Sequence, residues 1–206
     1  MSCKILVLIS GNGSNLQALL DRIARDEIDA DVVGVISNVA AAYGLTRAQQ
    51  RGVKIEIIPH KGFATRDEFD RALLTAMRAY DADLIVLAGF MRILSNDIVN
   101  AFLGRMINIH PSLLPKYTGL HTHQRALEAG DAEHGCSVHF VTPELDGGPV
   151  IAQARCAVLA GDDEKTLAQR VHLLEHKLYP AVVNAFANGR LRLRDGRSEV
   201  DEVIVV

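Results

Sequence analysis

The first half of the chain alternates between short apolar runs and segments in which apolar residues recur every three or four positions. The apolar run between Lys4 and Ile9 is typical of a strand that is buried on both faces. After a glycine-rich turn, the spacing from Asn15 to Ala24 predicts a helix. Further strands are expected at residues 32–36, 54–58, 84–88 and 105–109, and further helices at 40–50, at 65–80 and from Ser95.

This strand–helix rhythm predicts a parallel sheet with helices on both faces. Local signals support several of the boundaries. Thr65 and Glu68 have the spacing of a capping box at a helix N-terminus. Gly52 suits the end of the second helix, and Pro59 ends the third strand.

The second half has a different character. An irregular stretch with two prolines runs from His110 to Leu120. Two later strands are joined by a short Pro/Gly turn, which favours an antiparallel pair. The expected elements are a short helix at 122–129, the two strands at 137–141 and 150–158, a long helix at 163–187 bent at Pro180, and a tail of weak strand character from Leu191.

Composition narrows the class of protein. The chain has 206 residues, 49% hydrophobic and 23% charged, which suits a folded domain with a full core and excludes a disordered chain. The chain has three cysteines, Cys3, Cys136 and Cys156. A disulfide framework normally has more cysteines and an even number of them, so a reducing compartment is expected. The longest apolar run, Leu84 to Met91, is far shorter than the ~18 residues of a membrane span.

The N-terminus lacks the apolar core of a secretory signal, so we expect a soluble cytoplasmic protein without a membrane partner. With a net charge of −3, the chain lacks the excess of basic residues that is typical of nucleic-acid-binding proteins. Arg190, Arg192 and Arg194 are therefore interpreted as a solvated strand face.

The glycine turn after the first strand predicts an anion site. Gly11-Asn12-Gly13-Ser14-Asn15-Leu16 starts like a dinucleotide-binding fingerprint, but Leu16 replaces the third glycine. The second strand also ends in Ser37-Asn38 instead of the acidic residue that holds a ribose. What remains is a turn whose backbone N–H groups and polar side chains sit at a helix N-terminus, where phosphate binds well. The alternative is a tight, well-capped turn without a ligand.

The candidate chemistry lies in the second half. Five of the eight histidines fall between His110 and His139. Asn108 and His110 come at the end of the fifth strand, where open α/β sheets bind ligands, and their spacing of two puts them on the same side. An asparagine can donate to a developing oxyanion, and a histidine can move protons near neutral pH.

A second signal is the loop Glu144-Leu145-Asp146-Gly147-Gly148-Pro149. Two glycines after an aspartate let a carboxylate approach another chain segment closely. If Asp146 met His110, it would favour the imidazolium form. The spacing alone does not establish that contact.

These motifs resemble those of the folate-dependent formyltransferases. The string Asn108 to Pro115, followed by Asp146-Gly147-Gly148, marks the superfamily, and the turn at 11–15 narrows the resemblance to its glycinamide ribonucleotide branch. The similarity runs from the first strand to about Arg194 and includes Ala88 to Leu94 and Gly119 to His121. Thr118 replaces a proline that relatives often carry, and the tail after Arg194 matches nothing in the family.

The resemblance implies a three-layer α/β/α sandwich with a mostly parallel, mixed seven-stranded sheet that includes one antiparallel strand. It implies one formyltransferase domain over 1–206, with a Rossmann-like phosphate-binding half at 1–100, a catalytic and folate-binding half at 101–190 and a tail at 191–206. The positions that match the family's sites imply a catalytic role for Asn108, His110 and Asp146, substrate binding by Gly13, Ser14, Asn15 and Glu175, and folate binding by Arg66, Met91, Arg92, Ile93, Leu94 and Asn108.

The implied reaction transfers a formyl group from N10 of 10-formyltetrahydrofolate to the primary amine of glycinamide ribonucleotide, in purine synthesis. The amine attacks directly, and the tetrahedral oxyanion is stabilised by Asn108 and protonated His110. No metal is implied. The sequence leaves a homodimer possible.

Several of these residues also allow other interpretations. His121 and His123 form an H-x-H pair, but no third ligand stands at a familiar spacing. His139 either lines the site or is a satisfied core histidine, and Cys136 is by default a small buried thiol. Met91, Ile93 and Leu94 alone would be ordinary core.

Three other functions compete with the transferase. A formyltetrahydrofolate hydrolase runs the same chemistry with water and carries an extra N-terminal domain. A transfer-RNA formyltransferase carries a further C-terminal domain and a basic surface. A non-enzymatic nucleotide-binding module would keep the glycine turn without needing Asn108, His110 and Asp146 together.

Overall fold

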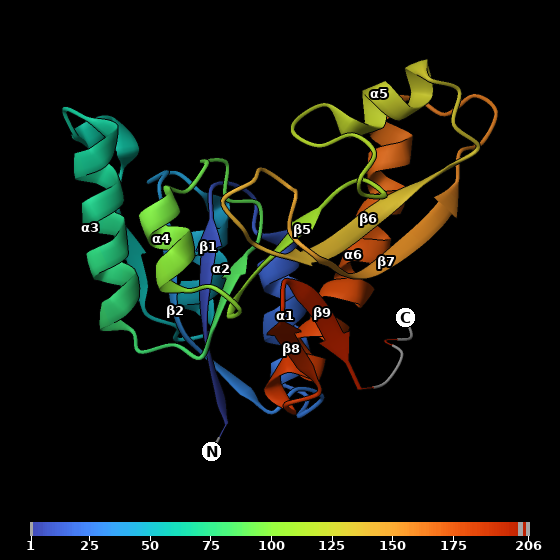
Figure 1. The fold of residues 1–206 in the computed structure, drawn as a ribbon. Coiled ribbons are helices and arrows are strands. Elements are labelled where there is room, and N and C mark those ends of the chain that lie inside the picture. The colour runs from blue at the N-terminus through green and yellow to red at the C-terminus, as the bar shows by residue number, and fades with distance from the viewer. Residues whose placement is uncertain (1, 202–203, 205–206) are drawn as a thin grey trace.

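The computed structural model describes residues 2–201 and 204, with strands and helices in alternation (Figure 1). The strands are β1 (Cys3–Ile9), β2 (Ala30–Ser37), β3 (Ile55–Ile57), β4 (Leu84–Leu87), β5 (Met106–His110), β6 (Glu133–Phe140), β7 (Val150–Ala157), β8 (Leu191–Arg194) and β9 (Arg197–Val200). The helices are α1 (Ser14–Ile23), α2 (Tyr43–Gln50), α3 (Arg66–Ala79), α4 (Asn96–Ala101), α5 (Thr122–Glu128) and α6 (Glu164–Ala187), with a 3-10 turn at His60–Gly62.

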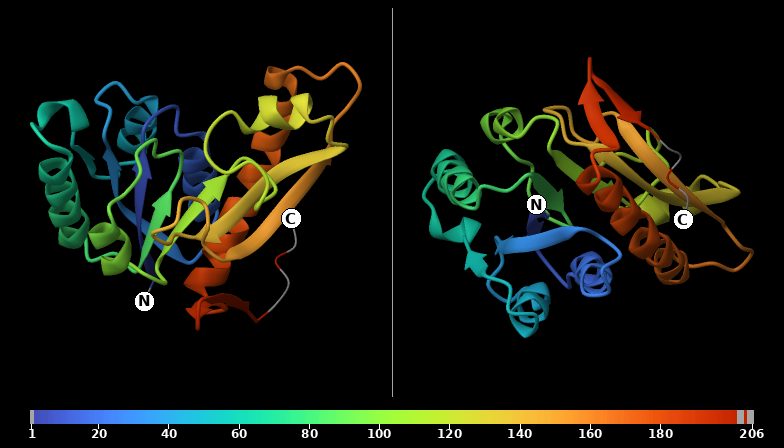
Figure 2. Two further views of the ribbon diagram at one scale, coloured as in Figure 1. Left: turned by 45° about the horizontal axis from the view of Figure 1, so that its top comes forward. Right: turned by 90° about the horizontal axis from the view of Figure 1, so that it is seen from below.

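Seven strands form one sheet in the order β3-β2-β1-β4-β5-β6-β7. The first five pair in parallel, and β6 runs antiparallel to both β5 and β7. The expected fold class, a mixed sheet with one antiparallel strand inside an α/β/α sandwich, is therefore confirmed. Figure 2 shows the helices on the two sides of the sheet.

The central strands are buried on both faces. Along β1, Ile5, Val7 and Ile9 pack into one apolar cluster, while Leu6 and Leu8 pack into another. The first cluster takes its helical members from α1, α2 and α6, and the second takes them from α3 and α4. The continuous apolar run predicted this two-sided burial correctly.

Two boundaries differ clearly from the expectation. β6 begins at Glu133 instead of residue 137, because Glu133, His134 and Gly135 already pair with β7 although they show no apolar alternation. α2 begins at Tyr43 instead of residue 40, because Ala42 donates its N–H to Val39 O in a turn before the helix.

The C-terminal part of the chain is more regular than the sequence predicted. α6 continues through Pro180, which is buried inside it. The tail of weak strand character is an antiparallel hairpin of β8 and β9, and Leu191 packs into the first apolar cluster. No helix among residues 2–201 has the length and apolar composition to cross a membrane.

The hydroxyl of Tyr179 ties α6 to the middle of the sheet. Tyr179 is fully buried, and its hydroxyl lies 2.9 Å from Leu87 O and 3.1 Å from Ile107 O. These two carbonyls belong to neighbouring strands, β4 and β5, directly before the strand end that carries Asn108.

Removing this hydroxyl should destabilise the fold. We expect Tyr179→Phe to lower the free energy of unfolding by about 0.5–1.5 kcal/mol, the usual net value of such a hydrogen bond. For a chain of this size that is a fall in Tm of about 2–4 °C per kcal/mol. Thermal unfolding followed by circular dichroism checks it. Tyr43→Phe, on the exposed side chain of α2, is the matched control and should leave Tm unchanged.

Candidate active site

A strip of polar side chains lies on one face of β5 and β6. The antiparallel register places Asn108 opposite His139 and His110 opposite Ser137. Because side chains two apart on a strand share a face, all four project to the same side of the sheet, while Ile107 and Ile109 join the core on the other side. The pairing of β5 with β6 therefore gives Asn108 and His110 polar neighbours that lie 27 or more residues away in the sequence.

The backbone of the following loop holds the imidazole of His110. Nε2 of His110 lies 2.8 Å from Tyr117 O, and Nδ1 lies 3.6 Å from Oδ2 of Asp146. A carbonyl oxygen can only accept, so Nε2 carries a proton and donates it to Tyr117. Nδ1 is therefore the nitrogen left for a substrate, and it lies beside Asp146.

Asp146 is shared among several groups. Its Oδ2 accepts a hydrogen bond from Gly119 N at 2.8 Å, and its Oδ1 lies 3.8 Å from Nε2 of His139. The side chain is largely buried between the two imidazoles. The sequence alone left the contact with His110 open, and the structure brings the two side chains together.

The glycines after Asp146 permit this approach. A Cβ on Gly148 would lie 1.8 Å from Phe140 O, so only glycine fits against the end of β6. Asp146 itself has φ of 50°, in the left-handed region that is uncommon for residues other than glycine. Such conformations persist where surrounding contacts hold them, and here the Gly119 N–H supplies one.

Ser137 and Gln153 anchor the loop that follows His110. The buried hydroxyl of Ser137 donates to Ser112 O at 2.6 Å and accepts from Leu114 N at 3.0 Å. Nε2 of Gln153, from β7, donates to Leu114 O and to the Ser137 hydroxyl, both at 2.9 Å. Two side chains of the sheet thus fix the start of the loop whose Tyr117 carbonyl holds His110.

A pair of histidines supports the other end of the loop. Nδ1 of His123, in α5, lies 3.1 Å from Nε2 of His134, in β6. Burial, together with the nearby imidazoles of His134, His172 and His110, lowers the pKa of His123 to about 4. Burial likewise lowers the pKa of His134. Thr122, beside His123, donates its hydroxyl to Pro111 O at 2.6 Å, so α5 and the loop are tied together.

The glycine turn lies between β1 and α1. Gly13 has φ of 73°, and a Cβ there would lie 2.7 Å from Gly44 Cα, so this glycine is required by the fold itself. Ser14 and Asn15 open α1, where backbone N–H groups lack helical partners. Arg47 holds the turn by donating to Asn12 O at 2.9 Å.

Asn15 links this turn to Glu175 on α6. Its Nδ2 donates to Oε2 of Glu175 at 2.9 Å, and both side chains are buried. Burial raises the pKa of Glu175, against the lowering effect of the Asn15 hydrogen bond. Oδ1 of Asn15 and Nε2 of His176 are buried without a hydrogen-bond partner among the described residues. Unpaired buried polar atoms are costly, so polar ligand groups are expected here.

Of the predicted folate residues, Met91 to Leu94 occupy the loop between β4 and α4, Arg66 opens α3 and Asn108 lies in β5. Nη2 of Arg66 donates to Ile93 O at 2.8 Å, and the guanidinium of Arg92 lies 5.3 Å from the centroid of the Phe69 ring. Met91 donates its N–H to the Ser10 hydroxyl. Leu94 differs from its neighbours because its side chain belongs to the core beside α3 and α4.

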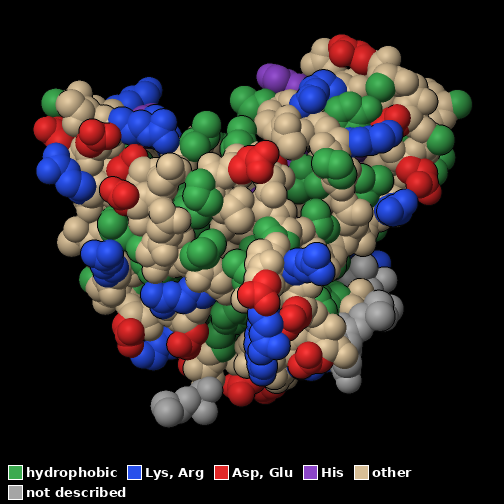
Figure 3. Space-filling view, in the orientation of Figure 1, with side chains coloured by type: hydrophobic (Ala, Val, Ile, Leu, Met, Phe, Trp, Pro, Cys, Tyr) green, Lys and Arg blue, Asp and Glu red, His purple; other side chains and the backbone are tan. Residues whose placement is uncertain are grey.

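Large apolar side chains are exposed on the loops of this part of the molecule. The exposed fractions are 70% for Met91, 58% for Ile93, 69% for Leu120 and 53% for Leu145. Figure 3 shows the surface hollowed between the α3 side and the α5 side of the molecule. Exposed apolar side chains of this size suit contact with a flat aromatic ligand.

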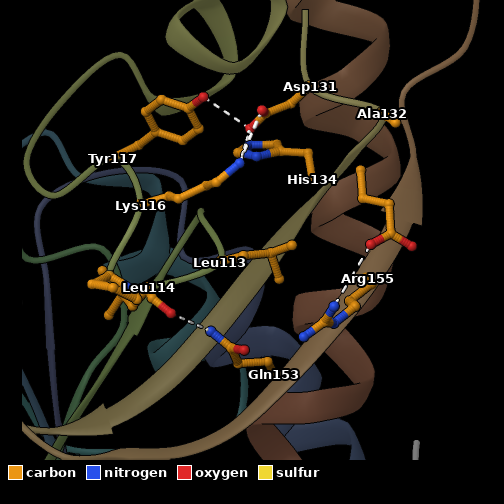
Figure 4. A pocket seen from close by; sticks show the side chains of 11 residues that line it. Leu113, Leu114, Lys116, Tyr117, Asp131, Ala132, His134, Gln153 and Arg155 are labelled. Carbon is orange, nitrogen blue, oxygen red and sulfur yellow. Dashed lines mark hydrogen bonds and ion pairs between the residues drawn. The ribbon is translucent and has the colours of Figure 1, made fainter. Parts of the chain in front are cut away.

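Two pockets lie outside the strip of polar residues on β5 and β6. One, of about 430 Å³, is lined by residues 113–117, 131–134, Gln153 and Arg155, and Figure 4 shows Lys116 and Tyr117 directed at Asp131 across it. The other, of about 370 Å³, lies along α1 and includes Ser14, Arg47 and His176. Neither includes Asn108, His110 or Asp146.

Residues 3–183 match the formyl transferase family. This chain belongs to the formyl transferase family. It is 53% identical to the phosphoribosylglycinamide formyltransferase of Escherichia coli K12 over 197 residues, 96% of this chain and 93% of that protein. It is 50% identical to the trifunctional purine biosynthetic protein adenosine-3 of Drosophila melanogaster over 90% of this chain, which is 14% of that larger protein.

Solved structures of the same family superimpose closely on this chain. The phosphoribosylglycinamide formyltransferase of Coxiella burnetii is 52% identical and superimposes with a TM-score of 0.93, covering 98% of this chain and 94% of that one. The glycinamide ribonucleotide transformylase 1 of Symbiobacterium toebii is 44% identical with a TM-score of 0.93, covering 97% and 94%.

Several groups at this candidate site could not be predicted from the sequence. The Tyr117 and Phe140 carbonyls leave no trace in a side-chain pattern. Ser137 and Gln153 become visible only once the register of β5, β6 and β7 is known. His123 pairs with His134, and among the described residues no group of three or more His, Cys, Asp or Glu side chains is arranged to hold a metal ion.

Acid should destabilise the fold through His123. Between its ordinary pKa of 6.5 and its folded pKa of about 4, the unfolded chain takes up a proton that the folded chain does not. The free energy of unfolding should therefore fall as the pH is lowered through this window, with no contribution from His123 above it. Urea unfolding at several pH values checks this.

His123→Gln removes the titrating group and keeps a polar side chain. The variant should lose less stability than the wild type between pH 7 and pH 5, when each is compared with itself. An equal loss in both proteins would contradict the assignment to His123.

Proposed function

We propose that this formyl transferase moves a formyl group from 10-formyltetrahydrofolate to the amine of glycinamide ribonucleotide. The observation that carries the proposal is the convergence of Asn108, His110 and Asp146 at one face of the paired strands β5 and β6. The relatives that are 53% and 52% identical to this chain are named for this activity, and the similarity covers nearly the whole chain. The three free cysteines are compatible with a reducing cytoplasm, where we place the reaction.

Three groups at the polar site suit the chemistry of direct transfer. The neutral amine attacks the formyl carbon, and the carbonyl oxygen becomes an oxyanion that Asn108 and the Nδ1–H of His110 stabilise. Nε2 of His110 donates to the Tyr117 carbonyl of the loop and does not contact the oxyanion. Oδ2 of Asp146 lies 3.6 Å from Nδ1, so its carboxylate is placed to pair with a proton on that nitrogen. A proton then passes from the attacking nitrogen to N10, and the C–N10 bond breaks.

The two substrates are assigned to two different segments of the chain. We assign the phosphate to the turn that contains Gly13, Ser14 and Asn15, at the N-terminus of α1. Glu175 and the unpaired Oδ1 of Asn15 are suited to hydroxyl groups of the ribose. The folate is assigned to the loop of Met91, Arg92, Ile93 and Leu94, with Arg66 beside it.

A formyltetrahydrofolate hydrolase would use the same three groups with water. The glycine turn, whose Asn15 is hydrogen-bonded to Glu175 of α6, favours a phosphorylated acceptor, because a hydrolase has less need for a phosphate-binding turn. The two functions make opposite predictions about one simple assay.

The assay follows deformylated folate by ultraviolet absorbance with and without the ribonucleotide. Product should form only when glycinamide ribonucleotide is present. Product formation at the same rate without the acceptor would indicate a hydrolase, and no product in either case would reject both enzymes.

Asn108 and His110 should act as one unit. We expect Asn108→Ala and His110→Ala each to lower kcat by at least ~10²-fold, the effect of losing one preorganised oxyanion donor. The double variant should lose clearly less than the product of the two effects, because both groups stabilise one charge. Steady-state kinetics of the four proteins check this. Fully multiplicative losses would mean that the two residues act on separate steps.

A further inference from the structure

His139 is the buried neighbour of Asn108 across the strand pair. Its side chain is 3% exposed and lies on the same face as the proposed catalytic groups. One ring nitrogen, Nδ1, lies 2.9 Å from Phe140 O, and the other, Nε2, lies 3.1 Å from Nδ2 of Asn108. The mechanism above gives this residue no part.

The Phe140 carbonyl decides which nitrogen of His139 carries the proton. A carbonyl oxygen only accepts, so Nδ1 is protonated and donates to it. The neutral ring then has a bare lone pair at Nε2, which can only accept. Burial favours the neutral form, since it lowers the pKa of His139.

A bare Nε2 in turn fixes the amide of Asn108. The two ends of an asparagine amide have nearly the same shape and differ in hydrogen bonding. Only the NH2 end can face a lone pair, so the amide is held with Nδ2 toward His139. The second N–H of the same nitrogen then remains for the reacting oxygen. A flipped amide would present Oδ1 to the oxyanion and repel it.

Asp146 lies close enough to His139 to favour the other tautomer of its ring, with the proton on Nε2. Its Oδ1 lies 3.8 Å from Nε2 of His139, so a proton on Nε2 would find a carboxylate nearby. That alternative tautomer would place a donor against the Asn108 NH2 group. The hydrogen bond to Phe140 O works against it.

We infer that His139 is a positioning residue, which locks the donor end of Asn108 onto the reacting oxygen through a tautomer set by the Phe140 carbonyl. The inference rests on the proposed formyl transfer. Its effect should appear in kcat, because the oriented N–H acts on charge that develops only in the transition state.

Two substitutions separate the two nitrogens. His139→Gln places an amide oxygen near the position of Nε2, where it can accept from Asn108. His139→Asn keeps a donor near the position of Nδ1 and has no atom that reaches Asn108. We expect His139→Asn to lower kcat by about tenfold or more, approaching the loss of an oxyanion donor, with both KM values within about twofold. His139→Gln should restore most of kcat.

The same variants in an Asn108→Ala background separate positioning from general packing. Without the Asn108 amide there is nothing to orient, so His139→Asn should cost no more than about twofold there. Equal losses in His139→Gln and His139→Asn, or an undiminished loss in the Asn108→Ala background, would overturn the inference. Circular dichroism confirms that each variant is folded.

A spectroscopic measurement needs neither activity nor a variant. The ¹⁵N spectrum of the histidine-labelled wild type, with His139 assigned, should show Nδ1 protonated and Nε2 bare at neutral pH. A proton on Nε2 would overturn the inference, whatever the kinetics show. Failure of formyl transfer by the wild type would instead reject the proposed function.

Discussion

The antiparallel pairing of β6 with β5 is the constraint on which the rest of the site depends. It sets Asn108 against His139 and His110 against Ser137, so residues far apart in the chain share one face of the sheet. A shift of this register by one residue would turn the β6 side chains to the other face. The parallel half of the sheet and the hydroxyl of Tyr179 hold β5 in place for this pairing.

Backbone groups then decide what each side chain can do. The carbonyls of Tyr117 and Phe140 each take one ring nitrogen, the first from His110 and the second from His139. Each imidazole is left with a single nitrogen on the side of Asn108 and Asp146. Because these groups are buried and oriented before a substrate arrives, little reorganisation is needed as charge develops.

The sequence predicted the parallel half of the fold well because burial on both faces gives continuous apolar runs. It also placed Asn108 and His110 on one side, since that depends only on the local period of a strand. It missed the start of β6, where Glu133, His134 and Gly135 show no apolar alternation. The partnership of His139 with Asn108 could not be read because a register and a carbonyl have no side-chain signature. The Asp-Gly-Gly loop indicated Asp146 as a candidate and the family resemblance implied its catalytic role, but the spacing could not establish its contact with His110.

The loop after His110 joins the separate parts into one unit. Tyr117 holds His110, and Gly119, two residues later, donates to Asp146 from a backbone N–H. Displacement of this short segment would free Nε2 of His110 and release the left-handed turn at Asp146 together. The proposed oxyanion site is therefore complete only while the segment is seated. Ser137 and Gln153 favour that state, because they anchor the start of the loop to β6 and β7.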